Sequence, residues 1–248
     1  MSVQVTGISG IPLIQKGDDL PAIICARTHF SDGDIICVAS TIVAKAKGYV
    51  RPLAEITPTP NAERIATKIG EDPRFIQGCL DSSAEIILEY PFILSVLPFS
   101  HVGVHAGVDN SNIEGENIIL LPKDPMAEAR EIRETIHQIT DISIGVIVTD
   151  TCGRAFRRGQ TGSAIGWAGM PAIRDFRGDH DLFGLELKIT EEAVVDEIAA
   201  FSNFIMGESD NGVPVVKFSG CDTWKGHDSL YFTKDEDLIR KALRIYHS

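Results

Sequence analysis

The chain of 248 residues is long enough for one large domain or two small ones. Its hydrophobic fraction of 44% and charged fraction of 23% are ordinary for a globular protein with a substantial core. The net charge of −12 and the pI of about 5.0 argue against binding to nucleic acid or to an anionic membrane, because both require a basic face.

The cysteines and the N-terminal residues predict a soluble, cytoplasmic protein. The five cysteines are an odd number and include no C-x-x-C pair, so neither a disulfide framework nor a zinc ribbon is expected. Met1 is followed by polar and glycine-rich sequence rather than by a charged and then apolar signal segment. The sequence also lacks a run of eighteen apolar residues, so no membrane span is expected.

The first half of the chain predicts two strands and one long helix. The apolar, β-branched runs Ile35–Ala39 and Ile118–Leu121 are typical of short buried strands. Between them, the proline-rich segment Thr57–Asn61 predicts a rigid turn rather than a linker. A helix is expected from Pro73 to Glu89, with Pro91 as its stop signal.

The second half alternates helices and strands without a regular order. Asp124 before Pro125 has the form of an N-cap and a first helical residue, and apolar residues then recur at helical spacing. Thr190 is expected to cap a further helix that ends at Gly207. The other expected elements are strands at Ile144–Val148 and Val213–Phe218 and a helix at Asp235–Tyr246. This mixture predicts an irregular α+β fold rather than a doubly wound sheet.

No linker divides the sequence cleanly. Residues 1–248 are therefore expected to form a single unit, with any boundary between two subdomains not readable from the sequence. Internal repeats and low-complexity segments are absent from the sequence.

A strand that passes into hydroxyl residues and then into lysines lies near residue 40. Ser40 and Thr41 follow the strand, and Lys45 and Lys47 come next, as in a cradle for phosphate. The sequence contains neither G-x-x-x-x-G-K-[ST] nor G-x-G-x-x-G, so any nucleotide must bind in another way. A plain helix cap at Ser40 and Thr41 is an equally good interpretation.

Residues 146–169 predict a site for a metal ion and an anionic substrate. An apolar strand ends in Thr149-Asp150-Thr151, whose carboxylate and hydroxyl oxygens suit a hard metal ion. The segment also contains Arg154, Arg157 and Arg158 and glycines at positions 153, 159, 162, 166 and 169. Arginine forks beside a glycine-rich loop can hold a phosphate or a carboxylate. Solvated surface arginines are about as compatible with the composition.

Two further acidic residues have a context that suggests a ligand. Asp109 lies among the small residues of Ala106–Asn112, where a ligand can come close. Glu208 follows Gly207, just past a predicted helix end whose dipole adds negative potential. Taken singly, each acid has a more ordinary interpretation, namely a turn or cap at Asp150, an Asx-turn at Asp109 and a solvated side chain at Glu208.

Other reactive residues are expected to be structural. His101 and His105 flank a glycine, which argues against a helical metal pair. Neighbouring arginines could lower the thiol pKa of Cys152, but it has no obvious histidine partner and is expected to be a packing residue. Trp167 and Trp224 are expected to pack, with stacking of Trp167 on a ring as the alternative.

These segments together resemble the coenzyme F420-0:L-glutamate ligase family, which adds γ-linked glutamates to a deazaflavin cofactor. The resemblance runs in order from about residue 7 to residue 213. The matching segments are Gly10–Leu13, Val38–Lys45, Gly107–Asn112, Thr149–Arg154, Arg158–Gly166 and Asp175–Gly178. Two residues depart from the family's usual pattern, because Ala155 stands where proline is common and Phe156 where tryptophan is occasional.

The resemblance implies a fold, an oligomeric state and a set of ligands. The fold would be the family's own α+β arrangement in an intertwined homodimer, here without the C-terminal nitroreductase-like domain of some relatives. The family uses GTP, a divalent ion (Mg²⁺ or Mn²⁺, at two expected sites) and often K⁺. The implied metal ligands are Asp109, Asp150, Thr151 and Glu208. Asp109 and Asp150 are also expected to be catalytic, together with Arg154, whose role is inferred from its charge. The guanine nucleotide is expected near Ile11, Pro12, Leu13, Ile14, Ser40, Thr41, Lys45 and Asn112, and along Met206, Gly207, Glu208, Ser209, Asp210, Asn211, Gly212 and Val213.

The expected chemistry is amide-bond formation through an acyl phosphate. GTP would phosphorylate the terminal carboxylate of F420-0, L-glutamate would displace the phosphate, and a second glutamate would join through a γ-linkage. From their charge, Arg154, Arg157 and Arg158 are expected to hold the precursor's phosphodiester or a carboxylate. A metal-dependent phosphohydrolase and a non-catalytic deazaflavin-binding module are the alternatives.

Overall fold

The structure is a computed structural model in which residues 2–246 are described. The chain forms two compact units, Met1–Met170 with Val195–Thr223, and Pro171–Val194 with Trp224–Ser248. The larger unit contains every residue predicted to bind the metal or the nucleotide.

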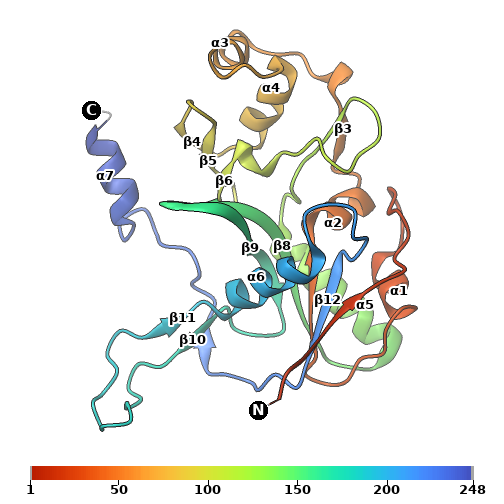
Figure 1. Ribbon diagram of the computed structural model, residues 1–248, viewed down its shortest axis with the longest axis vertical. Helices are drawn as coiled ribbons and strands as arrows, with labels where there is room; N and C mark the ends of the chain where they lie inside the picture. Colours follow the sequence, from red (N-terminus) through yellow and green to blue (C-terminus); the bar gives the residue numbers. More distant parts are fainter. Residues whose placement is uncertain (1, 247–248) are drawn as a thin grey trace. The chain divides into compact units, whose positions relative to one another are not determined.

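A five-stranded sheet is the centre of the larger unit (Figure 1). Its order is β1 (Gln4–Ile8), β12 (Val215–Ser219), β2 (Ile35–Ala39), β8 (Gly145–Arg154) and β9 (Arg157–Ala168). β2 and β8 are parallel, and the other neighbouring strands are antiparallel. The strand predicted at Ile35–Ala39 is confirmed at both ends, and those predicted at Ile144–Val148 and Val213–Phe218 are confirmed with shifted ends.

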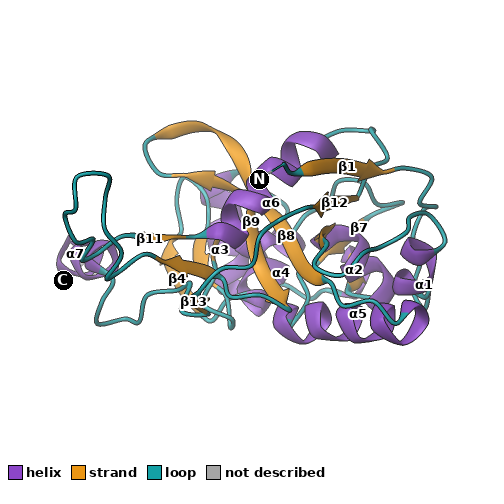
Figure 2. Ribbon diagram, turned by 90° about the horizontal axis from the view of Figure 1, so that it is seen from below, coloured by secondary structure: helices purple, strands orange, loops and turns teal. Residues whose placement is uncertain are grey.

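Helices cover both faces of this sheet because its central strands are apolar on both sides. Alternate residues of β2 and β8, such as Ile36 and Val146, join one core cluster with α1 (Leu20–Cys25) and α5 (Pro125–Thr140). On the other face, α6 (Val194–Met206) places Ser202 against Cys37 of β2. Figure 2 shows α5 and α6 on opposite sides of the strands. Burial on both faces explains why these strands read as continuous apolar runs.

The helix signals at Asp124 and Gly207 are confirmed. The Asp124 carboxylate accepts a hydrogen bond of 2.9 Å from the backbone N–H of Ala127, as an N-cap does. Gly207 follows α6 with a φ of 71°, the left-handed conformation that ends many helices. α2 (Ser40–Lys47) directly follows β2, and Ala39 is its N-cap residue. Neither Ser40 nor Thr41 is therefore the helix cap that the sequence allowed.

A smaller layer of the same unit is built from the segment between β3 and β7. It contains α3 (Pro60–Ile69), α4 (Pro73–Ser82) and two 3₁₀ turns, Leu53–Glu55 and His105–Gly107. Its strands form two small sheets, β4 (Glu85–Leu88) with β5 (Leu94–Val96) and β6 (Val102–Val104), and β3 (Val50–Pro52) with β7 (Asn117–Ile119). Ile65, Ile76, Ile93 and Ile118 are fully buried members of its separate core.

Three predictions about local structure were wrong or incomplete. The helix predicted from Pro73 to Glu89 ends at Ser82, because the chain turns there and Glu85–Leu88 pairs as a strand. Thr190 does not cap α6, since Glu191–Glu192 forms strand β11 between them. The rigid turn at Thr57–Asn61 is instead the start of α3, for which Thr59 is the N-cap.

The smaller unit has a three-stranded sheet of its own. β10 (Ile173–Asp175) lies between β11 and β13 (Gly226–His227), and α7 (Leu238–Tyr246) begins three residues later than Asp235, where a helix was predicted to start. Among the residues of this unit whose burial is described, seven large apolar side chains are exposed: Leu182, Phe183, Leu185, Ile189, Phe232, Leu238 and Ile239.

The mixture of helices with several small sheets confirms the predicted α+β class. Within residues 2–246, no helix combines the length and apolar character needed to cross a bilayer.

Candidate functional site

The register of the central sheet brings four distant segments to one end of it. Val215 of β12 pairs with Ile8 of β1 on one side and with Val38 of β2 on the other. Ala39 then pairs with Thr149 of β8. The segments that follow β1 and β2, the part of β8 just beyond Thr149 and the loop that precedes β12 therefore lie at the same edge (Figure 1). Ligands commonly bind where parallel strands end in this way.

Asp150 lies at this edge and is held by the start of α2. Its carboxylate accepts a hydrogen bond of 2.9 Å from the Ser40 hydroxyl. Gly107, two residues before Asp109, lies near the other carboxylate oxygen of Asp150, which a Cβ there would approach to 3.4 Å. Its φ of 65° and the close Leu121 side chain, which such a Cβ would overlap, are what favour glycine at this position. Ser40 thus orients the Asp150 side chain, a contact that the position of Ser40 in the sequence did not predict.

Asp109 forms the Asx-turn that was its structural alternative. Its carboxylate accepts from the Ser111 backbone N–H at 2.9 Å and from the Ser111 hydroxyl at 2.5 Å. The backbone of Asp109 also exchanges two hydrogen bonds with Ile119, which anchors the loop beside β7. An Asx-turn fixes the carboxylate without removing it from solvent, so it is compatible with a ligand role.

Glu208 joins the group from the loop after α6. One of its carboxylate oxygens, Oε1, accepts from the Thr151 hydroxyl at 3.2 Å and from the side-chain amide of Asn203. Asn203 is a residue that sequence reasoning missed. No motif marks it, and only the packing of α6 against β9 brings it to the site.

We call Asp109, Asp150 and Glu208 the carboxylate cluster. The pKa of Asp150 is raised to about 6, mainly by burial and to a smaller extent by the charges of Asp109 and Glu208, against the opposing hydrogen bond from Ser40. Within residues 2–246, none of the three makes an ion pair with lysine or arginine. Among the described residues their carboxylate oxygens do not all lie within 4.8 Å of one another. Together with the Thr151 hydroxyl they are nevertheless oxygen donors of the kind that Mg²⁺ and Mn²⁺ prefer.

The residues predicted to bind the nucleotide surround this cluster. The segment of Ile11 to Ile14 follows β1, Met206 to Val213 precedes β12, and Ser40, Thr41 and Lys45 lie on α2. The Lys45 ammonium donates a hydrogen bond of 2.5 Å to the Asn112 carbonyl, which ties α2 to the loop of Asp109. Leu13 is 86% exposed, so it offers an apolar surface next to the polar groups.

The glycine-rich segment after Asp150 is a β-hairpin, not a loop. β8 and β9 pair as far as Arg154 and Arg157, with a two-residue turn between them. At Gly162 a Cβ would overlap the carbonyl of Ala199 in α6, and at Gly166 it would overlap the carbonyl of Pro125 in α5. These two glycines therefore serve helix packing. The interpretation that they admit a ligand was wrong.

The other residues considered for a chemical role, Cys152, Trp167, Trp224 and His101, have structural environments. Burial raises the pKa of the Cys152 thiol, despite the opposing charge of Arg154, so the suggestion of a lowered pKa was wrong. The thiol lies 3.0 Å from the Ser163 hydroxyl. Trp167 is buried, as expected for a packing residue, and Trp224 donates to the Pro171 carbonyl at 3.1 Å. His101 is a buried histidine, as predicted.

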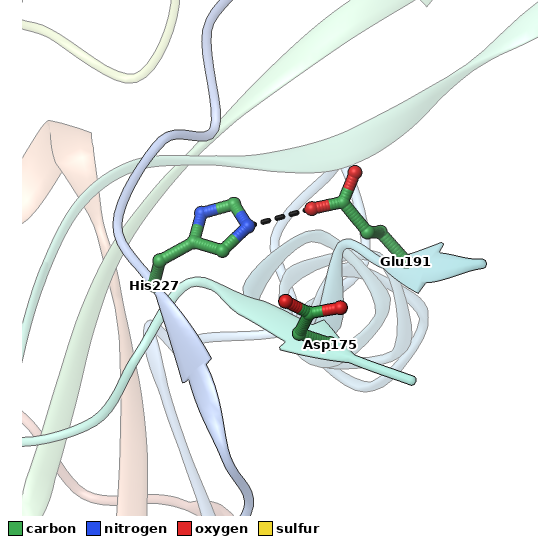
Figure 3. Close-up of side chains that lie close together, drawn as sticks. All are labelled: Asp175, Glu191 and His227. Atoms are coloured by element: carbon green, nitrogen blue, oxygen red, sulfur yellow. Dashed lines mark hydrogen bonds and ion pairs between the residues drawn. The ribbon is translucent and has the colours of Figure 1, made fainter. Parts of the chain in front are cut away.

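A second group with metal-type side chains lies in the smaller unit. One ligand atom from each of Asp175, Glu191 and His227 lies within 4.8 Å of the others (Figure 3). The Arg177 guanidinium already pairs with them, 2.7 Å from Asp175 and 3.3 Å from Glu191. Its hydrogen bonds lower the pKa of Asp175 to about 2. Because arginine supplies the positive charge, we interpret this group as an ion-pair network that joins β10, β11 and β13.

Comparison with known proteins identifies the family. The sequence profile of the F420-0:Gamma-glutamyl ligase family matches residues 9–220. The chain is 44% identical to the coenzyme F420:L-glutamate ligase of Archaeoglobus fulgidus, over 98% of this chain and 99% of that protein. The protein of the same name from Halobacterium salinarum is 46% identical over 96% of this chain and 95% of its own length. The chain belongs to the F420-0:gamma-glutamyl ligase family.

The family match also helps to separate the two acidic groups. Residues 9–220 include all of the carboxylate cluster, Thr151 and the predicted nucleotide segments. The match ends before His227, so the triad of Figure 3 lies only partly within the region that defines this ligase family. The carboxylate cluster is therefore our candidate active site.

Proposed function

We propose that this chain joins L-glutamate to the terminal carboxylate of F420-0 in the biosynthesis of coenzyme F420, with GTP as the source of energy. The observation that carries the proposal is the carboxylate cluster, which lies at the end of the parallel strands within the region matched by the ligase family. Curated relatives that carry the ligase name are similar along nearly the whole chain.

The reaction needs an activated carboxylate, because a free carboxylate does not react with an amine at neutral pH. A carboxylate oxygen of F420-0 attacks the γ-phosphorus of GTP, which gives an acyl phosphate and GDP. The amine of glutamate then adds to the acyl carbon, the C–O bond to phosphate breaks, and the amine loses a proton. In a second cycle the γ-carboxylate of the first glutamate takes the place of the F420-0 carboxylate.

The chain's own residues would position these groups. The segments after β1 and before β12 hold the nucleotide, with Lys45 beside the polyphosphate. Asp109, Asp150, Thr151 and Glu208 hold Mg²⁺ or Mn²⁺, at two sites and with K⁺ nearby. When bound, the divalent ion neutralises charge on the phosphates. Ser40 keeps Asp150 in place through its hydrogen bond, and Arg154 binds an anionic part of the acceptor.

We also propose that the active form is a homodimer. The support is the set of exposed apolar side chains on the smaller unit, which includes Leu182 and Phe183, both almost fully exposed. Leu182, Phe183 and Leu185 also lie close together in the sequence, and an apolar patch on a protein surface usually marks an interaction site.

The proposal is tested by measuring GDP release in the presence of Mn²⁺. With F420-0 and L-glutamate both present, GDP and the amide product should appear in equal amounts. Omission of either substrate should stop amide formation and reduce GDP release to background. GDP release without glutamate would indicate a phosphohydrolase, and F420-0 binding without any GDP would indicate a binding module.

Substitution of Asp150 tests the site itself. Asp150→Asn should reduce the rate of amide formation by roughly 10²-fold or more, because a carboxylate that binds the ion is lost. Asp141→Asn is a suitable control, since Asp141 is an exposed helix-end residue in a left-handed conformation that asparagine also tolerates. A near-normal rate for Asp150→Asn would contradict the assigned role.

A further inference from the structure

The tip of the β8–β9 hairpin has an unusual composition for this acidic chain. Arg154, Arg157 and Arg158 surround a two-residue turn formed by Ala155 and Phe156. Within the described residues, the three guanidinium groups have no hydrogen bond or ion pair, although the chain carries a net charge of −12. In Figure 1 the tip, drawn in dark green, extends past α6. Unpaired arginines on such a chain form a local anion-binding surface.

Phe156 is exposed at this tip and has an unfavourable backbone conformation. Its side chain is fully exposed, and its φ of 62° is a left-handed conformation at the second turn position, which glycine usually fills. A bulky aromatic residue is rare in this conformation, and such strain is found most often at functional positions. Neither burial nor turn preference explains a phenylalanine here.

The tip and the carboxylate cluster lie along the same strand. Arg154 is four residues beyond Asp150, or about 13 Å at roughly 3.3 Å per residue, and Phe156 lies farther out. Cys152 lies between Asp150 and Arg154 on β8, and both charges act on its thiol. A ligand bound at Asp150 could therefore extend along the hairpin toward the tip.

We propose that the hairpin tip binds the part of the acceptor that lies away from the reacting carboxylate, with its arginines on the phosphodiester and the Phe156 ring stacked on the flat heteroaromatic ring. This inference rests on the proposed function. The acceptor has a carboxylate at one end, then a phosphodiester, and an aromatic ring at the other end. Along the hairpin these parts would meet the carboxylate cluster, the arginines and Phe156 in that order. An arginine and an aromatic side chain together are a common platform for a ring that carries a phosphate.

The experiment measures steady-state kinetics with Mn²⁺ and each substrate varied in turn. Phe156→Leu should raise the KM for F420-0 about tenfold, as expected for loss of one stacking contact, and leave the KM values for GTP and glutamate unchanged. Phe156→Trp should retain the wild-type KM, because tryptophan keeps the stacking surface. The double substitution Arg157→Ala with Arg158→Ala should weaken F420-0 binding more at low salt than at high salt. Arg130→Ala, which removes an exposed arginine of α5, should change none of these values.

The outcomes separate this inference from the proposed function. If the wild-type chain forms no amide product, the proposed function fails and the kinetics cannot be measured. In that case fluorescence titration with F420-0 still tests the hairpin, and equal affinity for wild type and Phe156→Leu would overturn it. If the wild type is active, an unchanged KM for F420-0 in Phe156→Leu overturns the inference alone. A change in oligomeric state without a change in F420-0 affinity would also overturn it, because the tip would then contact a second copy.

Discussion

Thr151 and Asn203 both donate a hydrogen bond to Oε1 of Glu208. Two donors on one oxygen fix the plane of the carboxylate and leave Oε2 available. The loop after α6 would otherwise allow this exposed side chain to sample several rotamers, at a cost in entropy on binding an ion. If Glu208 binds an ion as proposed, we expect Asn203 to act as a positioning residue through Glu208.

Removal of the Asn203 amide should weaken ion binding more than it affects folding. For Asn203→Ala we expect a 10- to 100-fold rise in the Kd for Mn²⁺, the usual effect of losing a group that orients a ligand. Asn203→Asp should weaken binding further, because it places a second carboxylate against Glu208. Calorimetric titration with Mn²⁺ in the absence of substrates measures both values. An unchanged Kd in Asn203→Ala, with a folded protein by circular dichroism, would contradict the positioning role.

His101 makes the stability of the fold sensitive to acid. Burial lowers the pKa of His101 to about 4 in the folded chain, whereas in the unfolded chain it lies near 6.5. Between these values the unfolded chain binds more protons, so stability is complete above about pH 6.5 and falls as the pH decreases toward 4. The ring lies stacked beside Phe99, with centroids 6.3 Å apart.

This histidine should account for about 2 kcal/mol of lost stability between pH 7.5 and pH 5. Urea denaturation at both pH values measures the free energy of unfolding. His101→Gln has no titrating group there, so its loss over the same interval should be smaller by about that amount, whatever its stability at pH 7.5. Equal losses in the two proteins would show that another group is responsible.

At the scale of elements, the packing of α5 and α6 against the β8–β9 hairpin requires glycine at the contact positions of β9. α6 approaches β9 at Gly162 so closely that a methyl group would overlap the Ala199 carbonyl, which belongs to the backbone and cannot rotate away. Because α6 also carries Asn203 and leads into the loop of Glu208, this approach sets the position of part of the site.

Gly162→Ala should reduce the free energy of unfolding by about 1–3 kcal/mol, the usual effect of adding a group to a packed interface. Gly153→Ala in the paired strand is the matched control, since a Cβ there would meet nothing within 4 Å. Urea denaturation of both variants measures the difference. A Gly162→Ala protein as stable as Gly153→Ala would show that α6 can shift without loss.

Helix ends that depend on local signals were predicted correctly from the sequence. The end of α4 and strand β9, which depend on pairing and packing elsewhere in the fold, were not. The N-cap at Asp124 and the stop at Gly207 have local causes, and both were predicted. The end of α4 at Ser82 was not, because Glu85–Leu88 becomes a strand only through pairing with β5. β9 was missed for a related reason, since its glycines suggest a loop until the closeness of α5 and α6 is known.

For the whole molecule, the proposed dimer leads to a direct test with the exposed apolar residues of the smaller unit. The double substitution Leu182→Asp with Phe183→Asp should convert the chain to a monomer, because two charges would have to be buried at the interface. Light scattering after size-exclusion chromatography should show half the mass of the wild type. Ile139→Asp, at an exposed apolar position of α5, should leave the mass unchanged. A wild-type chain that is monomeric at micromolar concentration would contradict the proposal.

The candidate site could be predicted only as separate residues. Asp150 and Thr151 are recognisable at the end of an apolar run. No sequence pattern, however, indicates that the distant residues Asp109 and Glu208 lie beside them. Resemblance to a known family supplied that grouping. The register of β12, β2 and β8 explains why the loop of Glu208 lies near Asp150, and the contact of Lys45 with Asn112 ties the loop of Asp109 to α2. Asn203 could not be predicted because its contact depends on tertiary packing alone.

The place of β12 in the central sheet has a consequence for synthesis of the chain on the ribosome. β1 and β2 lie on either side of β12, which is made almost 180 residues after β2. Until Val215–Ser219 has left the ribosome, both strands have an exposed edge, and such edges tend to pair wrongly or aggregate. Until β12 pairs with both strands, the predicted nucleotide-binding segments that follow β1 and β2 also remain apart. We therefore expect the emergence of β12 from the ribosome, rather than earlier local folding, to determine when the proposed nucleotide site is complete.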